Sequence, residues 1–240
     1  MNKNCYRLIF NKARGIIMAV SEVVTTKGKS NADTQKSTSA RFSLKSLTLS
    51  IWALTSLIPL DVLSQVIVDN SAPANQRPTV SQAANGVPMV NIQTPNKQGI
   101  SHNTYRQFDV NQQGVILNNS RQDVQTQLGG WINGNASLAN GSASTILNEI
   151  NSQNPSLLNG YIEVAGQQAH VIIANPAGIT CNGCGFINAN QTTLTTGKPQ
   201  YKNGNLNAYL VERGQINFEG QGLDDRQSDY TNVIARSIEV

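Results

Sequence analysis

The chain has 240 residues, of which 39% are hydrophobic, 13% charged and 5% aromatic. The apolar share is too low for a polytopic membrane protein and high enough for a folded core, which excludes a fully disordered chain. The net charge of +4 is unevenly distributed: residues 1–64 hold 9 of the 18 basic and 3 of the 14 acidic side chains, which leaves 9 basic and 11 acidic ones afterwards. Because the basic excess lies in the first 64 residues, we expect no nucleic-acid partner.

An apolar run of 14 residues, 47–60, follows Arg41 and Lys45. That length is too short to cross a hydrocarbon layer of ~30 Å comfortably, and it is typical of the h-region of a secretory signal. Ser64 supplies the small residue that such a signal needs just before its cleavage site. We therefore predict cleavage between Ser64 and Gln65 and export through the Sec translocon. An uncleaved membrane anchor is the alternative.

The segment before this run is unusually long, because an ordinary signal has about 15–30 residues in total. Residues 1–24 are basic and partly apolar, residues 25–46 form a polar spacer with a second basic n-region, and residues 47–64 contain the h-region and the cleavage site. With its Tyr6-Arg7 pair, the segment resembles the extended signal peptides of large proteins secreted by Gram-negative bacteria. This resemblance implies slowed entry into the Sec channel. A misassigned start codon is the alternative.

From residue 65 onward, the sequence has the pattern of an all-β domain. It contains 25 Asn and 19 Gln in 176 residues, and long helical patterns are nearly absent. Short β-prone runs alternate with Gly, Asn and Pro, which is typical of strands separated by turns. The predicted strands are residues 87–93, 105–110, 114–118, 161–166, 170–175, 191–196, 206–213, 215–220 and 232–240. Only residues 143–150 have the pattern of a short helix.

Two all-β architectures fit these strands. A two-sheet sandwich needs bulky side chains on two large inner faces, and aromatic residues are scarce. A solenoid needs fewer, because each coil buries small aliphatic side chains against its neighbours and amides stack in ladders. The spacing from Ile162 to Phe186 and then to about Leu206 suggests a coil of twenty-odd residues. We predict a parallel β-helix with additional short antiparallel hairpins, and the sandwich is the alternative.

The last residues, 237–240, are strand-like and have no capping segment. An uncapped edge of a solenoid pairs readily with other strands. We therefore expect the sequence to be the N-terminal piece of a longer protein.

Two stretches, residues 86–120 and 174–199, closely resemble the filamentous-haemagglutinin-type domain of two-partner secretion. The resemblance extends over residues 65–240 and is nearest to contact-dependent growth inhibition effectors of the CdiA type and to large haemagglutinin adhesins. It implies a right-handed parallel β-helix that an outer-membrane transporter recognises through periplasmic POTRA domains. It also implies export through the periplasm to the outer cell surface or the medium, and contact with target cells through parts of the protein beyond this chain.

Two short motifs of this family have counterparts here. Asn154-Pro155-Ser156-Leu157 has Ser in place of the second Asn of the family motif, and Asn175-Pro176-Ala177-Gly178-Ile179 has Ala in place of its second Asn. Asn-Pro with a nearby Gly still favours a tight corner. The resemblance therefore implies that secretion and transporter recognition depend on Asn154, Pro155, Leu157, Asn175, Pro176, Gly178 and Ile179.

Cys181 and Cys184 form a C-x-x-C pair, whereas Cys5 lies in the predicted leader. Export brings the pair into an oxidising compartment, so we predict a structural disulfide, with inert thiols or a chemical role as alternatives. A redox site needs a helix N-terminus and a zinc site needs two more ligands, which His102 and His170 do not supply as a second pair. We predict packing or turn roles for both histidines, and neither a metal nor another cofactor.

Some β-helices are polysaccharide lyases, which need clustered acidic residues for a cation together with Arg or Lys. The nearest counterpart is Asp224-Asp225 with Asp229, beside Arg226, and a solvated loop is the commoner explanation of such a cluster. We therefore assign no catalytic residues. The sequence predicts a non-enzymatic secretion-targeting domain of a growth-inhibition toxin, which starts β-helix folding outside the cell. A domain that binds cell surfaces directly, as an adhesin, is the main alternative, and a lyase is a more remote one.

Overall fold

The computed structural model describes residues 6–11, 16–21 and 66–240. The chain divides into two compact units, Met1–Ile58 and Pro59–Val240. In the first unit, β1 (Tyr6–Asn11) pairs with β2 (Ile16–Ser21) in antiparallel orientation. The predicted h-region and the predicted cleavage site between Ser64 and Gln65 lie outside the described residues.

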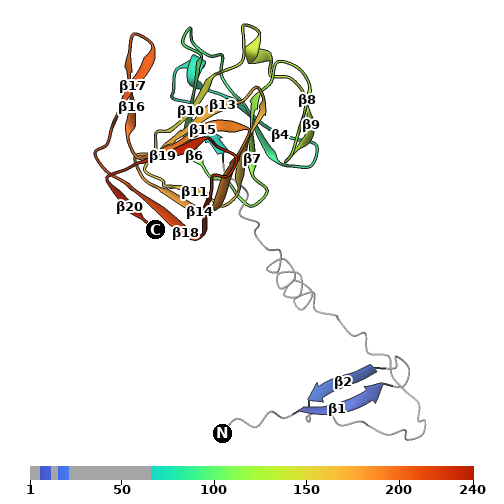
Figure 1. Ribbon diagram of the computed structural model, residues 1–240. Coiled ribbons are helices and arrows are strands. Elements are labelled where there is room, and N and C mark those ends of the chain that lie inside the picture. The colour runs from blue at the N-terminus through green and yellow to red at the C-terminus, as the bar shows by residue number, and fades with distance from the viewer. Residues whose placement is uncertain (1–5, 12–15, 22–65) are drawn as a thin grey trace, which may run out of the picture. The chain divides into compact units, whose positions relative to one another are not determined.

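The second unit is built from two sheets whose strands alternate along the chain (Figure 1). The first sheet contains, in order, β19 (Tyr230–Ile234), β15 (Ala189–Thr195), β13 (Ala169–Ala174), β10 (Thr145–Ile150), β6 (Ile100–Phe108) and β3 (Val66–Val68). The second contains β20 (Ser237–Glu239), β18 (Gln215–Asp224), β14 (Ile179–Ile187), β12 (Tyr161–Gly166), β7 (Val115–Asn119), β5 (Pro88–Asn91) and β4 (Thr79–Gln82), with β11 (Ser156–Leu158) also on β14.

Most neighbouring strands in both sheets are parallel, and only the pairs β3–β6 and β4–β5 at the N-terminal end are antiparallel. Successive coils therefore stack with their strands in register, as in a parallel β-helix. This confirms the predicted fold class and excludes the sandwich. Each of the nine predicted strand segments overlaps a strand of the structure, although the segment 232–240 is divided between β19 and β20.

The predicted coil length is confirmed for one coil and wrong for the next. Ile162 lies opposite Phe186, 24 residues later in the chain. Leu206, however, belongs to an antiparallel hairpin of β16 (Lys198–Lys202) and β17 (Asn205–Leu210). This insertion lengthens the coil, so that Cys181 in β14 lies opposite Phe218, 37 residues later. An insertion at a corner changes the spacing of the sequence repeat without disturbing the stack.

The predicted short helix at residues 143–150 is wrong, because Thr145–Ile150 is the strand β10. Ile146, Leu147 and Asn148 are consecutive and all fully buried. The strand lies between β6 and β13 and is covered on both faces, so it contains a run of consecutive buried residues without the alternation of a half-exposed strand. Such a run cannot be distinguished from a buried helix by periodicity alone.

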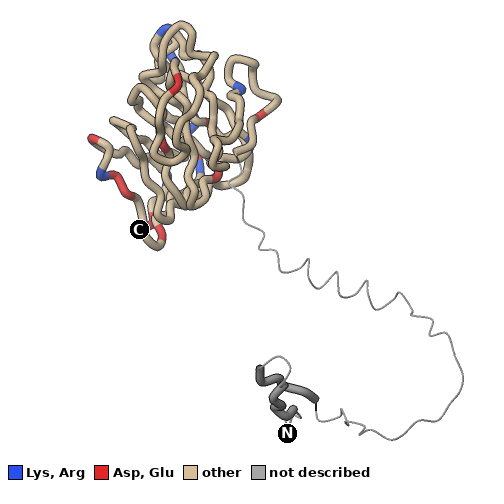
Figure 2. The backbone as a smooth tube through the Cα atoms, turned by 90° about the vertical axis from the view of Figure 1, so that its right-hand side faces the viewer, with Lys and Arg blue, Asp and Glu red and all other residues tan. Residues whose placement is uncertain are grey.

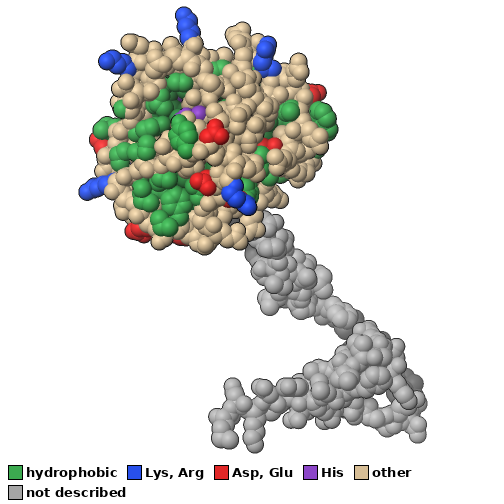
Figure 3. Space-filling model, in the orientation of Figure 1, with side chains coloured by type: hydrophobic (Ala, Val, Ile, Leu, Met, Phe, Trp, Pro, Cys, Tyr) green, Lys and Arg blue, Asp and Glu red, His purple; other side chains and the backbone are tan. Residues whose placement is uncertain are grey.

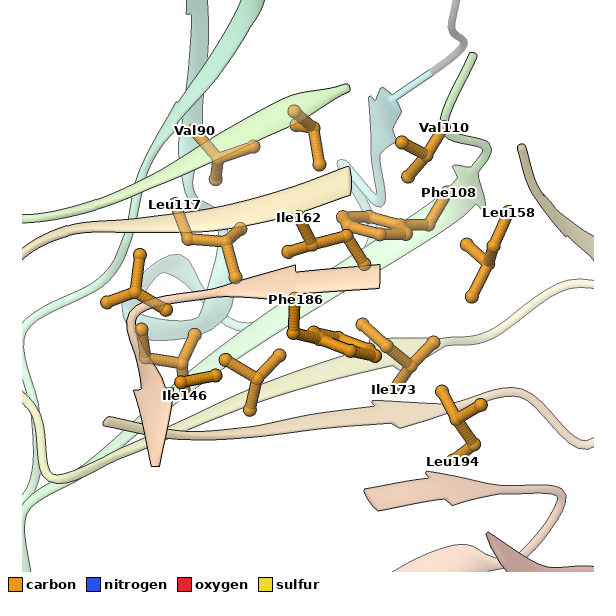
Figure 4. Packing of buried hydrophobic residues seen from close by; sticks show 14 of the residues in the cluster. Val90, Phe108, Val110, Leu117, Ile146, Leu158, Ile162, Ile173, Phe186 and Leu194 are labelled. Carbon is orange, nitrogen blue, oxygen red and sulfur yellow. The ribbon is translucent and has the colours of Figure 1, made fainter. Parts of the chain in front are cut away.

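The interior of the coil stack is a narrow column of aliphatic and a few aromatic side chains. Figure 4 shows them pointing inward from strands of both sheets. Phe108, Phe186 and Tyr105 are the largest side chains that are almost fully buried, and Tyr105 packs edge-on against Phe108 with 5.0 Å between ring centroids. Residues such as Ile146, Leu194 and Ile162 fill the space between them. A core this thin needs few aromatic residues, in agreement with the composition.

Stacked amides link neighbouring coils, as predicted. Asn103 in β6 lies opposite Asn148 in β10, and both are fully buried. Asn91 lies opposite Asn118, whose Nδ2 donates a hydrogen bond of 2.8 Å to the Asn91 Oδ1. Because each amide both donates and accepts, such ladders satisfy polar groups inside the stack.

Two antiparallel hairpins cover the outside of the stack, as predicted. The hairpin of β8 (Val124–Thr126) and β9 (Gly130–Ile132) is held at its turn by the buried Glu163, whose carboxylate accepts hydrogen bonds of 2.7 Å from the main-chain N–H groups of Gln127 and Leu128. The β16–β17 hairpin packs Leu206 and Tyr209 against the outer face of the first sheet. Two 3-10 turns, Ala74–Gln76 and Ala136–Leu138, complete the elements.

Charged side chains are sparse and scattered over this unit (Figures 2 and 3). Acidic residues are most frequent near the C-terminal end of the chain in Figure 2, whereas basic ones stand singly. Among the described residues, the structure has no helix of the length and apolar character that crossing a membrane requires.

Candidate functional site

The two Asn-Pro segments lie on successive coils, one above the other. The first precedes β11 and the second precedes β14, and these strands pair in parallel with Ser156 opposite Ile179. The sequence places the segments about twenty residues apart, which is close to one coil. The fold therefore brings both motifs to the same corner of the stack.

The second corner is a tight turn organised by Asn175. Its main-chain oxygen accepts a hydrogen bond of 3.0 Å from the Gly178 N–H, and its Oδ1 accepts one of 2.9 Å from the Ala177 N–H. Gly178 has a φ of 122°, a backbone conformation that favours glycine. The turn thus depends on the residue types that the motif retains, and not on its lost second Asn.

The Asn175 side chain also joins the second corner to the first. Its Nδ2 donates hydrogen bonds of 3.0 Å to the main-chain oxygen of Asn154 and to the Ser156 Oγ. A further hydrogen bond joins the two corners, because the Ser156 N–H donates to the Gly178 main-chain oxygen at 3.0 Å. We call this set of contacts the corner clasp. It forms only when the two coils are stacked.

The first corner is held from the other side by the preceding coil. The Leu157 N–H donates to the Asp109 Oδ1 at 2.9 Å, and the Asn154 Nδ2 donates to the Gln107 Oε1 at 2.8 Å. The Gln107 Nε2 in turn donates to the Asp109 Oδ2 at 2.6 Å. Burial raises the pKa of Asp109, and these two hydrogen bonds to its carboxylate oppose that rise. Sequence reasoning missed Gln107 and Asp109, because no local pattern marks them.

The seven motif residues divide sharply by exposure. Asn154 and Pro155 are exposed, and the Leu157 side chain is 43% exposed although it is apolar. The other four are buried, and Ile179 belongs to the central core. These four are Asn175, Pro176, Gly178 and Ile179. In the folded domain the first motif is open to a partner, whereas these four residues of the second motif are largely covered.

A groove of about 580 Å³ runs beside the stacked corners. Pro155 and Gly178 of the two corners line it together with Gln215 and Arg236 of the later coils. Asn217 also lines it, and its buried Oδ1 has no hydrogen-bond partner among the described residues. The sequence alone does not indicate that the later coils contribute to this corner, because the β16–β17 insertion changes the spacing between the paired strands β14 and β18.

Cys181 and Cys184 are joined by a disulfide inside β14, with their Cα atoms 5.3 Å apart. The pairing of β14 with β18 shifts register between Asn182 and Cys184, so the loop of the disulfide is a β-bulge. Gly183 lies in this bulge with a φ of 73°. Both cysteines are fully buried in the core and lie in a strand, not at the helix N-terminus that a redox site requires.

The two histidines are fixed by side chains from neighbouring elements. The His170 Nε2 lies 2.9 Å from the Thr193 Oγ1, and burial lowers the pKa of His170 to about 4. The His102 Nε2 lies 2.7 Å from the Glu149 Oε2, and its ring stacks on Tyr201 with 5.6 Å between centroids. These contacts agree with the predicted packing roles.

The acidic loop near the end of the chain is engaged in local contacts. Asp224 accepts hydrogen bonds of 2.6 Å from the Arg226 Nη2 and 2.7 Å from the Tyr161 hydroxyl, and Arg226 holds the pKa of that carboxyl well below its usual range. No group of three or more His, Cys, Asp or Glu side chains in the described parts of the chain is arranged to hold a metal ion.

Comparisons with known proteins agree with this architecture. The family model of the TPS secretion domain matches residues 64–240, and that of the Extended Signal Peptide of Type V secretion system matches residues 1–52. The crystal structure of the filamentous hemagglutinin secretion domain is similar, with a TM-score of 0.64 and 38% identity over 72% of this chain and 56% of that one.

Two curated relatives match over all of this chain. Toxin CdiA of Yersinia pestis is 53% identical over 244 aligned residues, and tRNA nuclease CdiA-2 of Burkholderia pseudomallei (strain 1026b) is 39% identical over 249. The chain spans only 7% and 8% of their lengths.

These matches favour secretion targeting over the adhesin and lyase alternatives. They also indicate Sec-dependent export through the periplasm to the outer surface or the medium, with an outer-membrane transporter as partner. With its stacked β-helix, its two Asn-Pro corners and its extended signal, the chain belongs to the family of TPS secretion domains, the secretion-targeting domains found in CdiA proteins.

Proposed function

We propose that the periplasmic POTRA domains of the outer-membrane transporter bind this domain while it is unfolded, and that folding outside the cell ends the contact. Both Asn-Pro segments then serve twice, first as recognition sequences and later as corners of the β-helix. The seven motif residues are the ones we assign to recognition.

The observation that carries this proposal is the division of the motif residues by exposure. Asn175, Pro176, Gly178 and Ile179 are buried in the folded domain. A partner that reads them needs an unfolded chain, and folding competes with such a partner for the same residues. The corner clasp therefore supports a one-way sequence of events, in which binding comes before folding.

The unfolded chain is well suited to pairing with the edge of another sheet. Its strands are short, extended and poor in charge, as β7 (Val115–Asn119) and β13 (Ala169–Ala174) illustrate. An extended peptide that adds to a sheet edge gains affinity from main-chain hydrogen bonds, which do not require an invariant sequence. We assign this mode of binding to the POTRA domains.

Folding beyond the outer membrane supplies the direction of transport. At roughly 0.05–0.15 kcal/mol per residue, a coil of about 24 residues contributes on the order of 1–4 kcal/mol. Each completed coil thus opposes backward movement of the chain. The first coils also form the surface on which later coils stack.

We further propose that residues 1–24, 25–46 and 47–64 act as extension, spacer and cleavable signal, with cleavage between Ser64 and Gln65. Strand β3 begins at Val66, so the mature domain then starts at its first strand. In the full-length protein we assign growth-inhibiting activity and contact with target cells to regions outside these 240 residues.

The experiment that tests the proposal measures secretion by the partner transporter. Replacing the exposed corner with Asn154→Ala and Pro155→Ala removes recognition and, among the hydrogen bonds of the corner, only the exposed one to Gln107. We therefore expect secretion to fall strongly while the folded domain keeps most of its stability. Asn159→Ala, at another exposed asparagine just after β11, is the matched control and leaves secretion unchanged. Unchanged secretion after replacement of both Asn-Pro corners contradicts the assignment.

A further inference from the structure

A second groove lies on the outer face of the first sheet, beside the β16–β17 hairpin. Figure 1 shows this hairpin projecting from the side of the coil stack. The cavity measures about 450 Å³, which is within the usual range of small-molecule sites. Its floor includes Ile172 and Ile234, and residues 205–209 of β17 form one wall. Neither Asn-Pro corner takes part in it.

The wall is an unprotected strand edge. β17 pairs only with β16, so its other edge has no partner among the described strands. Proteins usually protect exposed edges with lysine or proline. β16 carries Lys198, Pro199 and Lys202, whereas β17 has neither charge nor proline. The hairpin therefore leaves one edge of β17 without a strand partner, and residues 205–209 of this strand line the groove.

The groove is uncharged. Its fourteen lining residues include no Asp, Glu, Lys or Arg. The two titratable side chains are neutral at pH 7, because burial lowers the pKa of His170 to about 4 and raises that of Tyr209 to about 12. A phosphate, a carboxylate or an ammonium ion would lose its hydration here without gaining an opposite charge. The ligand that fits is therefore neutral.

The lining combines apolar surface with free polar groups. Ile172, Leu206 and Tyr209 belong to one apolar cluster. The side-chain amides of Gln98, Gln191, Asn205 and Asn207 make no hydrogen bond within the described part of the chain, and all four line the cavity. An acyl chain would leave these amides unpaired, which is costly. A sugar ring has an apolar face of C–H groups and a rim of hydroxyls, and it matches both features.

We propose that this groove binds a neutral oligosaccharide, with its apolar face over the partly exposed side chains of Leu206 and Ile234 and its hydroxyl groups on the β17 edge and on the amides of Gln191 and Asn207. An extended peptide is the competing ligand, since it also pairs with a free edge. The sugar is favoured because a strand added to β17 needs side-chain pockets in the floor, and the floor mixes Thr193 and Asn232 with isoleucines. This site is independent of secretion targeting.

The test is a titration of the purified chain followed by NMR, with lactose, maltotriose and N,N′-diacetylchitobiose as neutral probes. Sialyllactose is the charged comparison, and an acetylated and amidated peptide with the sequence of residues 205–210 is the peptide comparison. We expect saturable shifts confined to the groove for at least one neutral sugar. The double variant Gln191→Ala/Asn207→Ala should weaken this binding about tenfold, because two hydrogen bonds are lost.

Gln227→Ala, at an exposed loop position, is the matched control and should leave the affinity unchanged. The double variant should also be secreted normally, which separates this site from the transporter-recognition site. The proposal is overturned if none of the neutral sugars binds saturably, if the double variant binds them as well as the parent chain does, or if only the peptide occupies the groove.

Discussion

The side-chain amide of Asn175 lies 3.0 Å from the main-chain oxygen of Asn154 and donates a hydrogen bond to it, so that the two Asn-Pro corners are joined across successive coils. This contact exists only after folding. It links a proposed recognition sequence to a structural corner through a single pair of residues, so that mutations can separate the structural role from the proposed one.

Removing the Asn175 side chain should destabilise the folded domain. Asn175→Ala breaks the corner clasp and leaves buried polar groups without partners, at a cost of about 1–3 kcal/mol in the free energy of unfolding. Urea unfolding followed by circular dichroism measures the change. Asn154→Ala is the comparison, because the Asn154 side chain is exposed and its main-chain oxygen is retained. Equal losses in the two variants would show that the clasp contributes nothing specific.

Gly178 should tolerate no side chain. An alanine Cβ there would lie 3.1 Å from the main-chain oxygen of Gln215, and the backbone φ of 122° is unfavourable for alanine. We expect Gly178→Ala to lose about 1–3 kcal/mol of stability. Gly141 is the control, because its φ of 141° is similarly strained but a Cβ meets no atom within 4 Å. The thermal midpoint of Gly178→Ala should therefore fall further than that of Gly141→Ala.

The disulfide should contribute modestly to stability. It closes a very short loop, so it constrains the unfolded chain less than a long-range disulfide does, and we expect a loss of about 1–2 kcal/mol on reduction. Unfolding with and without dithiothreitol measures this loss. The double variant Cys181→Ala/Cys184→Ala is the control, and its free energy of unfolding should be the same with and without dithiothreitol. A fold that collapses entirely on reduction would contradict this assessment.

Acidification should destabilise the domain partly through His170. Burial lowers its pKa to about 4, below the ordinary value of 6.5. Between these values the unfolded chain binds the proton more readily, so the free energy of unfolding falls as the pH decreases from about 6.5 to about 4. His170→Gln removes this titrating group, so the free energy of unfolding should change less with pH over the same range. Parallel profiles for the two proteins would refute the role of His170.

Local patterns predicted much of the fold. The segment 161–166 coincides with β12, and the second Asn-Pro segment forms a tight turn, because Gly, Asn and Pro act through their own backbone preferences. The strand β10 was misread as a helix, since burial on both faces removes the alternation that marks a strand.

Long-range register was not readable from the sequence. The prediction that Leu206 begins the next coil is wrong, because the inserted β16–β17 hairpin lengthens the sequence repeat without changing how the coils stack. For the same reason Gln107 and Asp109, which hold the first corner from the previous coil, carry no sequence signal. The motif residues were found by family resemblance, but which of them are buried depends on stacking, and only the structure gives it.

Transporter binding to a destabilised domain tests the central claim most directly. Ile146→Ala truncates a fully buried side chain in β10, outside both Asn-Pro motifs, and such a change costs about 2–5 kcal/mol. If the POTRA domains bind the unfolded chain, this variant populates the binding-competent state more and should bind them more tightly than the parent domain. Equally tight binding of the stable parent domain and the variant would contradict the account.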